Sequence, residues 1–404
     1  MYDYGLFSAY SVMWNLTRMY RFPGDIDVDR LCDAVNKAIA NRPALYTVFE
    51  FDDECALVQR IAPEKMPRLF AEKLSEAEFS ERRHDLMRPF MMADEPMIHM
   101  HLFQTEQAVY LFFEIHHIMA DGSAWQLLNE DIVRAWNGEP LPLDTYYTYL
   151  RQQEKLRSSE KYREDREFFE KTYSGDDWSI NLVSDVQARP SGRVFRPLAR
   201  TVSRDEMKAF EENNHVSRQL LLTALGLLGN YAIEKNDKVL VDWVFHDRTD
   251  DVRRNAFGCL FRYITVGVEI GPGMTLRGFF DQLASRSNDG LAHCSYEWSV
   301  KRDNIFDHDM MFVVYETSDI TSTDFIGSLG GVKVDVECNT LVNCRGMIIQ
   351  AIESPDGIVT LLFFNEALYS NEKIAQAVDA FSEVLDRILK AEDLDRVKVS
   401  DLVR

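Results

Sequence analysis

Long apolar runs are absent from this sequence: no uninterrupted stretch approaches the ~20 residues that a membrane-spanning helix needs. The first residues also lack a basic region followed by an apolar run, so we expect no secretory signal. Cysteines are few, six in 404 residues, and they follow no regular spacing. We interpret them as reduced thiols and expect a cytoplasmic protein.

Positive charge is also scarce, because 45 Lys and Arg residues face 66 Asp and Glu residues and give a net charge of −21. Phosphate backbones attract Lys and Arg, so we expect neither nucleic acid nor an anionic membrane as a partner. No repeat or low-complexity segment is visible. A hydrophobic content of 46% in 404 residues predicts one large domain or two of ordinary size.

The patterns along the chain alternate between helix and strand and predict an α+β fold. In the first half we predict strands at 11–22, 45–51, 55–61, 97–103 and 108–115, and helices at 29–41, 73–84, 125–136 and 144–173. In the second half we predict strands at 239–245, 264–270, 310–315, 332–336, 347–352 and 358–364, and helices at 204–213, 218–230 and 371–390. The weakly patterned stretch 176–192 separates two domains, 1–176 and 177–404.

Two adjacent histidines, His116 and His117, end the predicted strand Val109 to Ile115. Asp121 and Gly122 follow in a short turn, and the next helix ends at Gly138. Side chains at adjacent strand positions point to opposite faces, so only one of the two rings can face a given cleft. The facing ring is a candidate catalytic base, and the alternative is a hydrogen-bonded core histidine. We expect no metal site, because neither ligand spacing nor the H-E-x-x-H pattern is present.

Residues 116–122 read H-H-x-x-x-D-G, which resembles the signature of the superfamily of chloramphenicol acetyltransferase and the condensation domains of nonribosomal peptide synthetases. Weaker resemblances cover most of the chain. Residues 25–49 resemble the family's helix and its R-H-E-x-L-R-T-x-F motif, but the two arginines of the motif fall on Asn41 and Tyr46. Residues 257–262 resemble I-G-x-F-V-N, with Arg262 at the position of the Asn. The other matches are Tyr146–Tyr149 with Y-x-D-Y, His246–Arg248 with G-R, His293–Tyr296 with H-Q-D-Y, and residues 357–389 with the C-terminal end of the family.

The resemblance implies two chloramphenicol-acetyltransferase-like lobes, each a mixed β-sheet with helices, arranged as a V with a central tunnel. It implies that His117 faces the tunnel as the catalytic base or as a group that orients the nucleophile. Supporting roles fall to His116, Asp121, Gly122 and Arg248, with Asp121 available to pair with Arg248. Arg262 is either a substrate contact or an exposed charge at a strand end, and Ser123 is a candidate helix cap.

The implied activity is an acyl or peptidyl transfer that forms an amide bond. The implied donor is a thioester on the phosphopantetheine of a carrier protein, the acceptor is a small amine or alcohol, and no covalently bound cofactor is expected. Three alternatives stay open: O- or N-acylation by a coenzyme A thioester, an inactive domain that docks carrier proteins, and an epimerase-like relative. A cyclising enzyme is not expected, because that branch replaces the histidines with aspartates.

Overall fold

The computed structural model describes residues 12, 14–91, 95–175, 177–186, 193–298, 311–317, 324–334, 336 and 347–403. The chain divides into two compact units. Unit 1 comprises Met1–Gln152, Asp247–Leu260 and Asp319–Val342, and unit 2 comprises Gln153–His246, Phe261–Ser318 and Asn343–Arg404. This division differs from the single boundary expected at residue 176. The change comes earlier because helix α6 (Glu160–Thr172) packs within unit 2 through Phe169, beside Leu240 and Tyr296.

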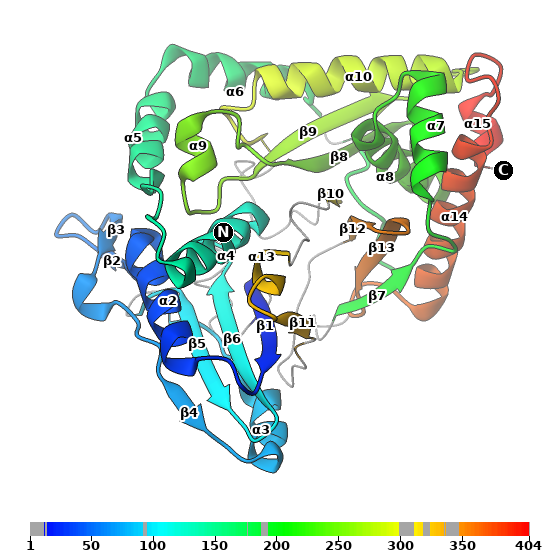
Figure 1. Ribbon diagram of the computed structural model, residues 1–404. Helices are drawn as coiled ribbons and strands as arrows, with labels where there is room; N and C mark the ends of the chain where they lie inside the picture. The colour runs from blue at the N-terminus through cyan, green and yellow to red at the C-terminus, as the bar shows by residue number, and fades with distance from the viewer. Residues whose placement is uncertain are drawn as a thin grey trace. The chain divides into compact units, whose positions relative to one another are not determined.

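Unit 1 is built on a five-stranded mixed sheet (Figure 1). Its strand order is β11 (Val332–Val334), β1 (Asn15–Pro23), β6 (Ala108–His116), β5 (Ile98–Gln104) and β4 (Ala71–Lys73). Strand β6 is central and antiparallel to both of its neighbours, with His116 opposite Asn15 of β1. Almost all of β6 is buried, as expected for a strand that is covered on both faces.

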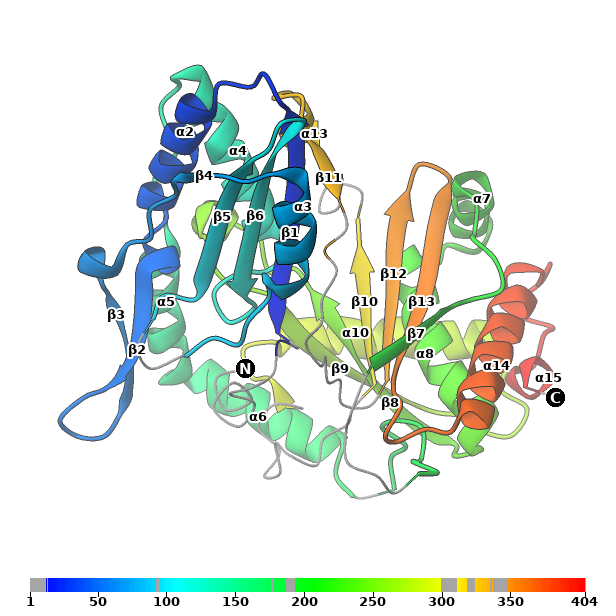
Figure 2. The ribbon, with the colours of Figure 1, turned by 90° about the horizontal axis from the view of Figure 1, so that it is seen from below.

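Helices cover both faces of this sheet. Helices α2 (Val28–Asn41) and α4 (Gly122–Asn137) pack on the face that carries Leu111 and Phe113, and α3 (Glu76–Arg82) places Phe79 against Phe112 on the other face (Figure 2). The Asp27 side chain caps α2 by accepting from the Arg30 N–H. A separate hairpin pairs β2 (Thr47–Phe51) with β3 (Leu57–Ile61). Short helical turns are η1 (Pro43–Tyr46), η2 (Pro63–Lys65) and η3 (Arg83–Asp85).

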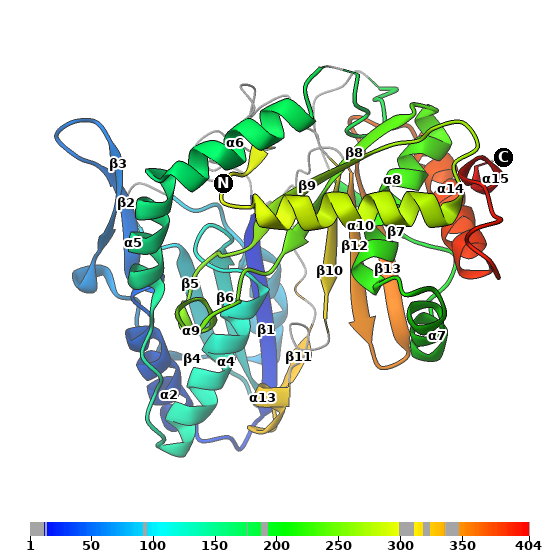
Figure 3. The same cartoon turned by 90° about the horizontal axis from the view of Figure 1, so that it is seen from above.

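Unit 2 contains a six-stranded sheet in the order β7 (Arg193–Pro197), β13 (Gly357–Asn365), β12 (Ile348–Ser354), β10 (Phe312–Glu316), β8 (Lys238–Phe245) and β9 (Arg262–Glu269). Strand β10 is parallel to both of its neighbours, and the other pairs are antiparallel. Helices α8 (Arg218–Glu234), α10 (Leu276–Ala292) and α14 (Asn371–Leu389) share one core with it. Figure 3 shows α10 running alongside β9 and α14 beside α8. Among the described residues, the other helices of unit 2 are α7 (Arg204–Asn214) and α15 (Val399–Leu402), those of unit 1 are α9 (Asp251–Asn255) and α13 (Asp324–Gly327), and α5 (Tyr146–Arg157) spans the boundary at residues 152 and 153.

The predicted α+β class is confirmed, and most predicted elements are present near their expected bounds. Two predictions need correction, and some elements were not predicted. The helix expected at 144–173 is two helices, since Ser159 caps the second. The strand expected from Leu45 begins only at Thr47, after η1. Helix α10 and strands β4 and β7 were not predicted; the glycines and polar residues of α10 blur its periodicity, although Phe279 and Leu283 are buried.

Some predicted strand ends, including residues 11, 310 and 335, lie outside the described residues. Over the part of the chain that is described, every helix is too short or too polar to cross a membrane.

Candidate functional site

The two histidines at the end of β6 differ in their surroundings. His116 donates its backbone N–H to the Met97 carbonyl at 3.0 Å, and His117 donates to the Trp14 carbonyl at 2.7 Å. These partners precede β5 and β1, the neighbours on opposite sides of β6. The His116 side chain is 5% exposed, whereas that of His117 is partly exposed. The structure therefore separates a buried histidine from one that is partly exposed.

His116 closes the turn after β6. Its Nδ1 accepts the Ile118 N–H at 3.1 Å, so the ring proton resides on Nε2. Burial, aided by the charge of neighbouring His117, lowers the pKa of His116 to about 3. A ring that stays neutral and is bonded to its own turn is unsuited to exchange protons with a substrate near pH 7. The supporting role that the resemblance implies for His116 stays a prediction.

His117 lies beside a thiol that the sequence analysis did not single out. Its Nδ1 is 3.7 Å from Cys259 Sγ, and its ring meets that of Trp14 edge-on at 6.1 Å between centroids. Both His117 and Cys259 belong to unit 1. No sequence signal could have paired them, because 142 positions separate them. The position of His117 in a tunnel stays a prediction.

Asp121 is a buried anchor, with a side chain that accepts three hydrogen bonds. The residue is 3% exposed. Oδ1 accepts the Ala124 N–H at 2.9 Å, so Asp121 caps α4, and the expectation that Ser123 caps this helix is wrong. Gly122 is the first residue of α4. Oδ1 also accepts from Arg248 at 2.8 Å, and Oδ2 accepts the Leu260 N–H at 2.9 Å.

The ion pair expected between Asp121 and Arg248 is present, and it does more than brace a turn. The Arg248 guanidinium also donates to the carbonyls of Arg253 and Ala256 and, at 3.0 Å, to that of Gly258. These bonds and the Leu260 bond fix the stretch 253–260 against Asp121. The pair therefore positions Cys259 near the end of β6.

Tyr146 supports the same stretch from α5. A Cβ added to Gly258 would lie 2.3 Å from Cε2 of the Tyr146 ring, so only glycine allows this approach. The Tyr146 hydroxyl donates to Gln59 Oε1 at 3.3 Å, and burial raises the pKa of Tyr146 far above its ordinary value. The Y-x-D-Y resemblance thus marks a packing contact with the segment that carries Cys259.

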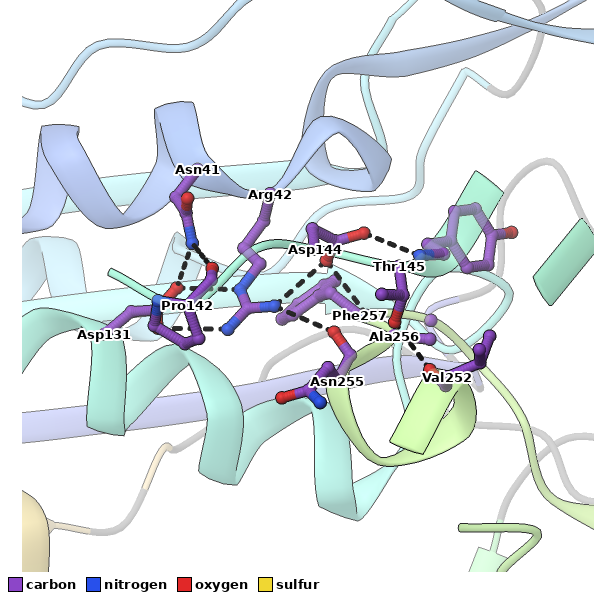
Figure 4. Close-up of polar contacts among 12 residues, drawn as sticks. Asn41, Arg42, Asp131, Pro142, Asp144, Thr145, Val252, Asn255, Ala256 and Phe257 are labelled. Atoms are coloured by element: carbon purple, nitrogen blue, oxygen red, sulfur yellow. Dashed lines mark hydrogen bonds and ion pairs between the residues drawn. The ribbon is translucent and has the colours of Figure 1, made fainter. Parts of the chain in front are cut away.

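Arg42 forms a second buried ion network in unit 1 (Figure 4). Its fully buried guanidinium donates to Asp131 of α4 at 2.7 and 3.0 Å, to Asp144 at 3.1 Å and to the Asn255 carbonyl at 3.1 Å. Asn41 also donates to Asp131, at 2.9 Å. The family's two arginines fall on Asn41 and Tyr46, but the buried arginine of this network is the neighbouring Arg42, which was not predicted from the sequence. A charged residue next to a helix-ending proline gives no sign of burial.

Arg262 is not the exposed strand-end charge offered as one alternative. It begins β9, is 7% exposed, and donates to Gln153 Oε1 at 2.5 Å and to the Cys294 carbonyl at 3.3 Å. These partners lie in unit 2, as does Arg262 itself. Its contact with a substrate stays a prediction.

The described residues contain no group of three or more His, Cys, Asp and Glu side chains that could hold a metal ion. Around His117 the structure brings together an imidazole, a thiol and a buried ion pair. Such groups can move protons and attack a carbonyl.

Comparisons with known proteins place these features in a family. The family model "Condensation domain" matches residues 1–400. Tyrocidine synthase 3 of Brevibacillus parabrevis is 20% identical over 423 residues, which span 100% of this chain and 6% of that protein. Surfactin synthase subunit 1 of Bacillus subtilis (strain 168) is 21% identical over 395 residues, 93% of this chain and 11% of that protein. The chain thus spans only a small part of these relatives.

Solved structures share the fold at low sequence identity. The X-domain from teicoplanin biosynthesis matches with a TM-score of 0.78 at 15% identity, covering 97% of this chain and 93% of its own. The first condensation domain of the calcium-dependent antibiotic synthetase, in complex with a substrate analogue, matches with 0.74 at 16% identity, covering 99% and 96%. A mutant of the starter condensation domain of rhizomide synthetase RzmA, in complex with C8-CoA, also matches with 0.74, at 14% identity, covering 98% and 94%.

Proposed function

The chain belongs to the condensation domain family, and we propose on this basis that it forms amide bonds in nonribosomal peptide biosynthesis. The donor is an acyl or peptidyl thioester on the phosphopantetheine of a carrier protein, and the acceptor is an amine. One observation carries the proposal: the intact H-H-x-x-x-D-G motif presents a partly exposed His117 while it keeps His116 buried and neutral.

His117 is the group that we assign to the reaction. Its neutral ring accepts the proton that the amine loses when it attacks the thioester carbonyl. A positioned base of this kind contributes about 10²–10⁴-fold to the rate. For an amine with a pKa near neutrality, orientation of the nucleophile by the same ring supplies part of this effect.

Asp121 and Arg248 act on the reaction only through His117 and its surroundings. The pair fixes the start of α4 and the stretch 253–260, both of which adjoin the end of β6. A buried ion pair of this kind is rigid, because either charge alone would be strongly disfavoured in the protein interior. We therefore assign these residues to support.

The test is the His117→Ala variant, assayed with carrier proteins loaded with aminoacyl thioesters. We expect amide formation to fall by about 10²–10⁴-fold. His215→Asn is the matched control, since His215 is exposed and occupies a left-handed helix end that Asn tolerates. Unchanged product formation in His117→Ala would show that the assignment of the base is wrong.

A second candidate keeps the fold and takes the acyl group from coenzyme A, for transfer to an amine or alcohol. The complex of the similar RzmA starter domain with C8-CoA favours it. Mass spectrometry of acceptor mixtures incubated with a panel of acyl-coenzyme A thioesters tests this candidate. The absence of transfer from every member of the panel would count heavily against it. A chain that binds loaded carrier proteins but turns over neither donor is a docking domain.

A further inference from the structure

The thiol of Cys259 contacts one particular nitrogen of the His117 ring. Cys259 Sγ lies 3.7 Å from Nδ1, within hydrogen-bond distance for sulfur. In a neutral imidazole one nitrogen carries the proton and the other offers a lone pair, and only the lone pair can act as a base. The group that contacts Nδ1 therefore influences which nitrogen of His117 is the base.

The backbone that carries this sulfur is held on both sides of Cys259. The Gly258 carbonyl accepts from the Arg248 guanidinium at 3.0 Å, and the Leu260 N–H donates to Asp121 Oδ2 at 2.9 Å. Asp121 and Arg248 are paired with each other, and both side chains are largely buried. The position of the sulfur is therefore set by a buried ion pair.

The His117 ring is held by further contacts with Trp14. The His117 N–H donates to the Trp14 carbonyl at 2.7 Å, and the Trp14 indole meets the imidazole edge-on, with 6.1 Å between the ring centroids. An aromatic contact of this geometry is directional and restricts rotation of the ring. Backbone, ring edge and Nδ1 of His117 are thus each in contact with a neighbouring group.

We propose, on the basis of the transfer reaction proposed above, that Cys259 is a positioning residue for His117. Its sulfur accepts the hydrogen of Nδ1–H and so holds the ring proton on that nitrogen. Nε2 then keeps its lone pair, and this lone pair takes the proton of the attacking amine. In many enzymes an oxygen atom fixes the tautomer of a catalytic histidine in this way, and here a sulfur atom does so.

In the reaction the Cys259 thiol forms no bond to the acyl group. The amine nitrogen attacks the thioester carbonyl, the carbon–nitrogen bond forms, and Nε2 of His117 takes the proton that the amine loses. The bond to phosphopantetheine sulfur breaks, and Nε2 gives this proton to the departing sulfur. While the ring is positively charged, its hydrogen bond to Cys259 is stronger, because a charged donor makes a stronger bond than a neutral one.

The neighbouring histidine provides an internal reference with the opposite tautomer. His116 Nδ1 accepts the Ile118 N–H at 3.1 Å, so the proton of this ring is on Nε2. The inference therefore assigns opposite tautomers to two adjacent rings. Since the hydrogen bond at one nitrogen determines the tautomer, loss of the Cys259 sulfur should leave His117 as a mixture of both forms.

The first test measures the tautomer and needs no substrate. The histidines of the whole chain are labelled with a nitrogen isotope for NMR, and the ring nitrogen shifts of His117 are identified by their loss in His117→Gln. At about pH 8, where an ordinary histidine ring is neutral, we expect Nδ1–H in the wild type and in Cys259→Ser, whose oxygen also accepts. Cys259→Ala should show a mixture, with His116 unchanged. A wild-type His117 ring protonated on Nε2, or the same tautomer in Cys259→Ala, would overturn the inference.

The second test measures amide formation from an aminoacyl-loaded carrier protein. We expect Cys259→Ala to lower kcat by about three- to tenfold with KM unchanged, as for the loss of one hydrogen bond, and Cys259→Ser to restore most of the rate. The matched control is Cys32→Ala, which removes a half-buried thiol from α2 and should keep the wild-type rate. If Cys259→Ala has the wild-type kcat, the positioning role is overturned and the proposed function stands. If the wild-type chain transfers nothing, the proposed function is overturned and the role of Cys259 in it as well.

Discussion

Arg248 lies 2.8 Å from Asp121, although 127 positions separate the two residues along the chain. The pair joins the turn after the two histidines to a segment that lies between strands β8 and β9. Both side chains are largely buried, so removal of either partner would leave an uncompensated charge in the protein interior. The geometry around His117 depends on this long-range contact.

Removal of Asp121 should destabilise the protein strongly. In Asp121→Ala the buried Arg248 loses its counter-charge and α4 loses its cap, so we expect a loss of about 3–5 kcal/mol in the free energy of unfolding. Urea denaturation measures the change. Ser123→Ala is the control, because Ser123 does not cap α4, and it should change stability by less than about 0.5 kcal/mol. A larger loss of unfolding free energy in Ser123→Ala than in Asp121→Ala would refute the assignment of Asp121 as the cap.

Arg42→Met should also be destabilising, by about 3–5 kcal/mol near pH 7, because it leaves Asp131 and Asp144 buried without their partner. Burial already raises the pKa of Asp144, and Arg42 opposes that rise. In the variant the Asp144 carboxyl should bind a proton more readily in the folded than in the unfolded chain. The loss of unfolding free energy in Arg42→Met should therefore become smaller as the pH falls.

Urea denaturation at several pH values measures this dependence on pH. Arg60→Met is the matched control, since Arg60 pairs with Glu50 and Glu64 at the exposed surface. It should lose no more than about 1 kcal/mol. If the loss of unfolding free energy in Arg42→Met stays constant with pH, the Asp144 carboxyl does not take up a proton in the folded variant as the pH falls.

His116 should contribute a dependence of stability on pH. Its folded-state pKa of about 3 lies below the ordinary 6.5, so the unfolded chain takes up the proton first as the pH falls. The stabilisation is complete above pH 6.5 and is lost as the pH falls from there towards 3, with a slope approaching about 1.4 kcal/mol per pH unit. His116→Asn, which can still accept from Ile118, should have a shallower slope in denaturation curves. An unchanged slope would mean that His116 binds a proton in the folded protein.

Gly258→Ala should disturb the contact between Tyr146 and the segment that carries Cys259. The new Cβ would overlap the Tyr146 ring, and overpacking of this kind costs about 1–3 kcal/mol. We expect a lower melting temperature and a changed alkylation rate at Cys259. Gly271→Ala is the control, since an added Cβ there meets open space. Equal melting temperatures and equal Cys259 alkylation rates in the two variants would show that the Tyr146 ring moves aside without loss of stability.

The residues around the histidine pair illustrate what could be predicted. The apolar run 109–115 and the spacing of Trp125, Leu128 and Ile132 predicted a strand and a helix, and both are present because such patterns act within one element. Gly138 ends the helix with φ 73°, as its position predicted. The ion pair between Asp121 and Arg248 was predicted correctly only because the family resemblance suggested it.

Other features could not be predicted from the local sequence. The burial of Arg42 and the unpredicted helix α10 each depend on neighbours distant in the chain. Glycines and polar residues in α10 weaken its periodicity, and packing on the sheet of unit 2 compensates for this weakness.

By itself, the sequence determined the α+β class, most helices and strands, and the family motif, because these follow from periodicity, capping and turn chemistry over a few residues. Only the tertiary structure decided which titratable groups meet: Cys259 with His117, and Arg42 with Asp131. Contacts across 142 and 89 positions produce no periodic signal, since each is one hydrogen bond or ion pair created when separate elements pack together.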